Sequence, residues 1–127
     1  MNKLMNLKEM EKRYSDGEDS LDLTVDKWVR IYEFLETAFT LEHFIEVLHA
    51  AVIPLFLCVE YKDRCEFCPL FRVCERGQSE IFNKVMRMIQ SYTIAGDLLP
   101  RDPLLGIIGN FVEELKKCES DARGKAC

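Results

Sequence analysis

Four of the six cysteines lie close together in the middle of the sequence. They follow the spacing C-x6-C-x2-C-x5-C and are Cys58, Cys65, Cys68 and Cys74. The central C-x2-C pair allows two thiolates to reach one metal from a tight turn, and the outer two can complete the set. Four thiolates suit zinc or an iron–sulfur cluster. The spacing therefore predicts a metal centre with these four cysteines as its ligands.

Disulfide bonds are the alternative use of closely spaced cysteines. They need an oxidising compartment, whereas residues 1–10 mix charged with apolar side chains and do not resemble a secretory signal. We therefore expect a reducing, cytoplasmic location, in which thiolates stay available to a metal. Cys118 and Cys127 lie outside the motif and are expected to be free thiols.

The spacing also bears on which metal is bound. Structural zinc sites usually combine two short C-x2-4-C pairs separated by a longer span. This sequence has one such pair, and its partner cysteines are separated from it by six and five intervening residues. A single long loop suits the separated corners of a cubane cluster better than one zinc ion. An iron–sulfur cluster is therefore the favoured interpretation, and a four-cysteine zinc site is the alternative.

The motif resembles the cluster loop of the endonuclease III and adenine-glycosylase family of DNA repair enzymes, which has the same spacing. In that family Pro-Leu often follows the third cysteine, as Pro69 and Leu70 do here. A basic residue precedes the second cysteine, where this chain has Lys62 and Arg64, and Asp63 replaces a proline of the family. The resemblance implies a [4Fe–4S] cluster in which each of the four cysteines binds one iron.

This resemblance covers residues 58–74, or about thirty residues if the preceding helix with His43 and His49 is included. The family's Leu-Pro-Gly turn and its catalytic Asp and Lys lie upstream of the loop, and the 57 residues before Cys58 contain no Leu-Pro-Gly. Glycosylase activity is therefore not carried over. No other catalytic set stands out, and the two histidines are expected to be ordinary core or surface residues. We expect a protein that is not an enzyme.

Length and composition predict one globular domain. The chain has 127 residues, of which 48% are apolar, as is typical of a protein with a packed core. The longest apolar run, residues 50–59, contains Pro54 and is too short to span a membrane. Residues 1–20 and 119–127 are expected to be peripheral parts of the domain.

The charge distribution limits the choice of partner. The net charge is −5, and acidic residues outnumber basic ones in residues 21–49. Nucleic-acid-binding proteins normally present a basic face. Four cations of the cysteine motif could contact nucleic acid or a protein partner, although solvated surface charge is the simpler interpretation. They are Lys62, Arg64, Arg72 and Arg76.

Apolar residues before the motif recur at helical spacing. A weakly amphipathic helix is expected over residues 3–14. Thr24 is the expected N-cap of a helix that reaches about Phe39, and Thr40 caps a further helix that Pro54 ends. The expected core residues of these two helices are Val25, Trp28, Val29, Ile31, Tyr32, Phe34, Leu35, Phe39, Leu41, Phe44, Ile45, Leu48 and Val52.

A further helix is expected directly after the motif. Residues 77–79 open it, and Gly96 is a suitable C-cap. Its buried face is expected to consist of Ile81, Phe82, Val85, Met88, Ile89 and Tyr92.

The last helix has two candidate starts. One is the Asp102-Pro103 pair, and the other is Asn110, which forms a capping box with Glu113. With either start the helix reaches about Lys117. Gly106 and Gly109 either allow close packing or mark a turn. The expected inward residues are Phe111, Val112 and Leu115.

These patterns together predict an all-α domain of four to five helices, with the cysteine motif between the central ones. The expected function is that of a small non-enzymatic iron–sulfur protein. Its cluster would be structural or redox-sensing, and the protein would act as an accessory or regulatory factor that binds a protein or nucleic acid. A zinc-stabilised helical adaptor or regulator is the alternative.

Overall fold

All secondary structure in the described part of the chain is helical. The computed structural model describes residues 4–37, 40–53, 60–62, 68, 70 and 80–125, with side chains described as far as residue 122. The helices are α1 (Leu7–Ser15), α2 (Ser20–Leu35), α3 (Leu41–Ala51), α5 (Glu80–Ala95) and α6 (Asp102–Lys125). The predicted all-α class is therefore confirmed, with five helices among the described residues.

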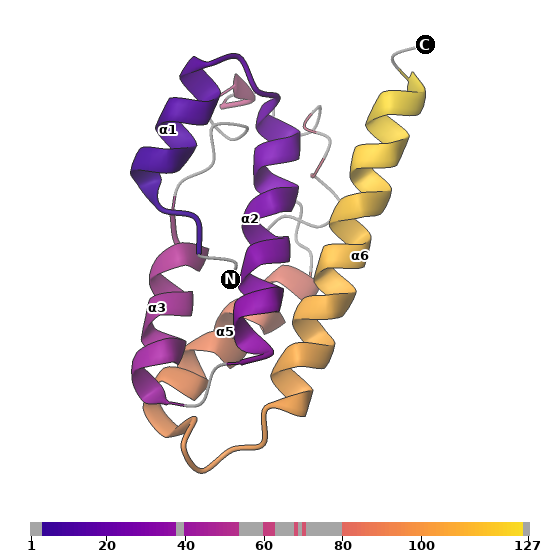
Figure 1. The fold of residues 1–127 in the computed structure, drawn as a ribbon. Helices are drawn as coiled ribbons and strands as arrows, with labels where there is room; N and C mark the ends of the chain where they lie inside the picture. Colours follow the sequence, from indigo (N-terminus) through magenta and orange to yellow (C-terminus); the bar gives the residue numbers. More distant parts are fainter. Residues whose placement is uncertain are drawn as a thin grey trace.

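Four of these helices enclose the core. Helix α2 contacts α3 and α6, while α5 contacts the same two helices from the other side (Figure 1). The shorter α1 packs on α2. Because α3 and α5 are consecutive among the described helices, the cysteine motif lies in the connection between two helices that pack together.

Aromatic rings join the helices at the centre of the molecule. Trp28 of α2 is 2% exposed, and its ring centroid lies 4.9 Å from that of Phe111 of α6. Phe82 of α5 lies 6.5 Å from Trp28, also edge-on. Phe44 of α3 and Tyr92 of α5 form a second ring pair at 5.4 Å. Ring pairs of this kind add to the free energy gained by burying apolar area, so they strengthen the packing between helices.

Helix α2 begins one turn earlier than the sequence predicted. Its N-cap is Asp19, whose side chain accepts hydrogen bonds from the backbone N–H groups of Leu21 and Asp22. The prediction of Thr24 as the cap was wrong. Thr24 lies inside the helix, and its hydroxyl donates to the Ser20 carbonyl. The buried face of α2 starts with Leu21, so the earlier start brings a further apolar residue into the core. The helix ends at Leu35, and the predicted end at about Phe39 lies outside the described residues.

Helix α3 has the predicted N-cap but a rotated buried face. The Thr40 hydroxyl accepts from the His43 N–H, and His43 Nδ1 accepts from the Thr40 N–H, which forms a capping box. Val47 is fully buried, whereas Ile45 and Val52 are exposed, contrary to the prediction. The buried residues Phe44, Val47 and Ala51 follow the i, i+3, i+7 spacing of one helix face. Ile45 and Val52 lie off that face.

Helices α5 and α6 carry the core residues that the sequence predicted, but α6 is longer. It begins at Asp102, so the alternative start at Asn110 was wrong. It also continues to Lys125, past the predicted end at about Lys117. The reason is that its buried stripe does not stop at Leu115. Cys118 continues the stripe with 2% exposure.

Salt bridges dock α1 against α2. Arg13 Nε lies 2.7 Å from Glu18 Oε2, and Arg13 Nη1 lies 2.6 Å from Asp26 Oδ2. Arg30 Nη1 pairs with Glu9 Oε2 at 2.8 Å. The hydrogen bond from Arg13 lowers the pKa of Glu18, because it stabilises the charged carboxylate. Since these side chains are partly exposed, the network orients α1 more than it adds to stability.

The space around two glycines shows how closely the chain packs at each position. A Cβ on Gly96, directly after α5, would lie 2.5 Å from Phe44 Cδ2, whereas a Cβ on Gly106 in α6 would have nothing within 4 Å. We expect Gly96→Ala to lower the free energy of unfolding by about 1–3 kcal/mol, because Phe44 would have to move. Gly106→Ala should raise it by up to about 1 kcal/mol, because alanine is the better helix former. Urea denaturation measures both, and equal stability of the two variants would contradict this packing.

Candidate metal centre

The described part of the cysteine motif comprises residues 60–62, 68 and 70. Of the four predicted ligands the structure describes Cys68, while Cys58, Cys65 and Cys74 lie outside the described residues. Among the described residues, which include one of the four thiols, no three His, Cys, Asp or Glu side chains gather as a metal site. The convergence of the four thiols therefore stays a prediction. The donor set itself fits zinc or an iron–sulfur cluster.

Residues of the motif pack against the helical core. Leu70, two positions after Cys68, is 5% exposed and belongs to the main hydrophobic cluster. Cys68 and Tyr61 are partly buried and contact the same cluster. The part of the motif around Cys68 and Leu70 is therefore attached to the core. A metal bound there would be connected directly to the packing of the helices.

A carboxylate that the sequence analysis did not identify holds the start of the motif. Glu60 accepts hydrogen bonds from the Tyr14 hydroxyl at 2.8 Å and from the Ser20 hydroxyl at 2.7 Å. The bond to Glu60 raises the pKa of Tyr14, because the phenol's proton is held by the carboxylate. Tyr14 lies in the last turn of α1 and Ser20 begins α2, so Glu60 attaches the motif to the corner between these helices. Nothing in the local sequence indicates this long-range contact.

A buried lysine holds the point at which the chain leaves α3. The side chain of Lys27 is 1% exposed, and its ammonium donates to the carbonyls of Ala51 at 2.9 Å and Ile53 at 3.0 Å. The last carbonyls of a helix lack partners within the helix, and a cation there is also stabilised by the helix dipole. The Lys27 ammonium lies 5.4 Å from the centroid of the Trp28 ring. Lys27 thus fixes the chain shortly before Cys58.

The remaining predicted residues are the four cations of the proposed contact surface and the two cysteines outside the motif. Lys62 is described and exposed, as expected for a contact residue, whereas Arg64, Arg72 and Arg76 lie outside the described residues. Cys118 contributes a buried side chain to the core and forms no disulfide. Cys127 is outside the described residues.

Both histidines have the ordinary roles predicted for them. His43 takes part in the capping box of α3, and its ring packs edge-on against Phe34 at 5.6 Å. His49 is exposed on α3. Their positions give no indication of a catalytic pair.

Comparisons with known proteins do not assign this chain to a family. The chain matches no protein-family model, no curated protein and no solved structure at a significant level. Within the described ranges, no helix has both the length and the apolar character needed to cross a bilayer.

Proposed function

We propose that this chain is a small non-enzymatic protein built around a [4Fe–4S] cluster, held by Cys58, Cys65, Cys68 and Cys74. The observation that carries the proposal is the spacing of these four cysteines within the connection between α3 and α5. The contacts of Leu70 and Cys68 with the core support it, since they show that part of the motif is positioned by the fold.

The proposed role of the cluster is structural or redox-sensing. Four thiolates occupy the coordination positions that the protein can supply, so the centre would have no open position for a substrate. When bound, the cluster would supply one-electron chemistry and a cross-link within the motif. The chain's own residues would do the rest: Glu60 and Lys27 hold the start of the motif and the end of α3.

A regulatory or accessory role requires a partner. We assign the contact to the cations in and beside the motif, with Lys62, Arg64, Arg72 and Arg76 as contact residues. A protein partner is favoured over nucleic acid, because the net charge of −5 repels phosphate outside this local group of cations.

Anaerobic purification followed by iron, sulfide and zinc analysis tests this function. We expect about four iron and four sulfide per chain, together with the broad visible absorption of a cluster. About one zinc per chain without sulfide would replace the proposal with the zinc-stabilised adaptor. Protein that is stably folded and contains none of these elements would refute both.

A further inference from the structure

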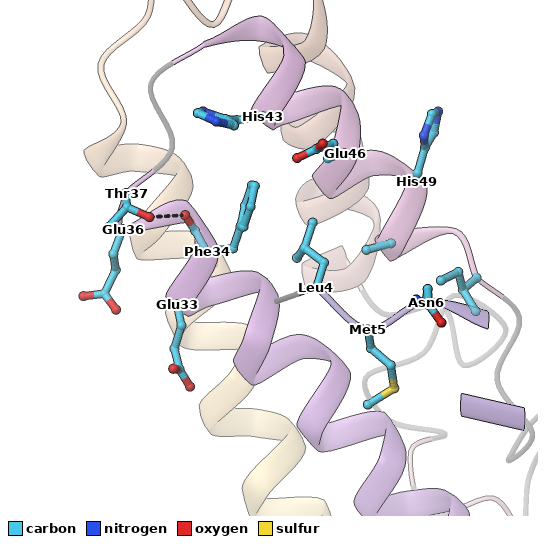
Figure 2. A pocket seen from close by; sticks show the side chains of 12 residues that line it. Leu4, Met5, Asn6, Glu33, Phe34, Glu36, Thr37, His43, Glu46 and His49 are labelled. Carbon is cyan, nitrogen blue, oxygen red and sulfur yellow. Dashed lines mark hydrogen bonds between the residues drawn. The ribbon is translucent and has the colours of Figure 1, made fainter. Parts of the chain in front are cut away.

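A second surface lies apart from the cysteine motif, in a groove between α2 and α3. Its volume is about 870 Å³, and residues 4–6 also line it. Figure 2 shows side chains from both helices and from this N-terminal segment around the groove. Leu4 and Phe34 lie between the two helices, and both are half-buried. The lining is mainly apolar, so the groove can receive apolar side chains.

The walls of the groove carry negative charge. Glu33 on α2, Glu36 directly after that helix and Glu46 on α3 all line the groove, so glutamates come from both of its sides. Residues 31–61 contain neither lysine nor arginine. None of the salt bridges found in the described ranges involves these three glutamates.

Arg101 and two histidines lie beside these glutamates, and Lys116 lines a neighbouring pocket with Glu33 and Glu36. Arg101 donates to the backbone carbonyl of Glu36 rather than to its carboxylate. His43 and His49 also line the groove. Such a surface combines an apolar floor with an acidic rim.

We propose that this groove binds a basic amphipathic helix of a partner protein. Two helices as walls form a channel of the kind that receives a third helix, whose apolar stripe occupies the floor. Lysine or arginine residues on both sides of that stripe would meet Glu46 on one wall and Glu33 on the other. The charge rules out two competing occupants, since nucleic acid and anionic membranes would both be repelled. A second copy of this chain, with its net charge of −5, is also a poor match.

A designed helical peptide tests the proposal. The probe is a fluorescein-labelled amphipathic peptide of about eighteen residues, with leucine at helical spacing and lysine elsewhere. Fluorescence anisotropy should show saturable binding to the full chain at low salt that weakens as salt is added. A peptide with every leucine replaced by serine keeps the charge and should lose the binding. Absence of binding at low salt, or equal binding of the two peptides, would overturn the proposal.

Matched variants locate the binding site. Glu33→Gln combined with Glu46→Gln should weaken binding of the leucine–lysine peptide by roughly three- to tenfold, because two exposed charge pairs are lost. Glu113→Gln combined with Glu114→Gln makes the same change in charge on α6 and should leave the affinity within about twofold. Leu4→Ser should also weaken binding, because it removes an apolar side chain from the floor of the groove. Circular dichroism checks that each variant is folded. Equal weakening by both glutamate pairs would show non-specific attraction and overturn the assignment.

Discussion

Cys68→Ala is expected to remove the metal centre from the purified protein. The variant loses one of four thiolate ligands, and the three that remain cannot close the coordination of zinc or of a cubane cluster. Metal analysis should therefore fall from about one centre per chain to almost none. The experiment also tests whether the part of the motif that packs on the core is the part that binds metal, since Cys68 contacts the main hydrophobic cluster.

The same variant should be strongly destabilised. Because a metal site does not exist in the unfolded chain, the free energy of binding, on the order of 10 kcal/mol for structural zinc, becomes free energy of folding. We expect a loss of at least about 3 kcal/mol in the free energy of unfolding. Thermal melting followed by circular dichroism measures this loss. We expect α5 to lose its helicity first, because it directly follows the motif.

Two other cysteines serve as controls. Cys127→Ala lies outside the motif and should keep both metal and stability. Cys118→Ala should keep the metal but lose about 1 kcal/mol, because it removes a buried sulfur from the core stripe of α6. Loss of metal from Cys127→Ala to the same extent as from Cys68→Ala would contradict the ligand assignment.

Lys27→Met is expected to lower the free energy of unfolding by about 2–3 kcal/mol. Methionine fills nearly the same volume, but it cannot donate to the carbonyls of Ala51 and Ile53, and each unsatisfied buried carbonyl costs about 1–3 kcal/mol. Removing a buried charge returns part of its desolvation cost, which offsets some of the loss. We expect the lost hydrogen bonds to outweigh that gain, because both carbonyls lie at the end of α3, where the helix dipole also favours a cation.

Urea denaturation compares this variant with Lys12→Met. Lys12 is exposed on α1, so its replacement should change stability by no more than about 0.5 kcal/mol. If Lys27→Met were as stable as the unmodified chain, the buried lysine would not be holding the end of α3. A chelator competition on the same variant shows whether the position of this chain segment also affects metal retention.

Much of the fold could be predicted because helices leave a periodic signal. The stripe around Trp28 and the cap at Thr40 both reflect spacings of three or four residues, which one helix determines by itself. The errors occurred where two local signals competed. Asp19 and Thr24 are both good caps, and the burial of Leu21 decides for the earlier one. The end of α6 was predicted too early, because Cys118 was assigned as a free thiol although it continues the buried stripe of the helix.

The candidate site was predicted unevenly for a similar reason. The cysteine spacing is a local pattern, so a ligand set could be predicted from it without any structure, and that ligand set stays a prediction. Glu60 and Lys27 were not identified, since their partners lie far away in the sequence. Tyr14 is 46 positions before Glu60, and Ala51 is 24 positions after Lys27.

By itself the sequence determined the helical class, most of the apolar stripes and the position of a four-cysteine motif between helices. Each of these depends on residues a few positions apart, whose relation any helix or short loop preserves. The tertiary structure alone decided that Lys27 is buried at the end of α3, that Gly96 leaves space for Phe44, and that glutamates from two helices face one groove. Those features arise when separate helices pack, and the relative rotation and distance of two helices depend on all the side chains between them.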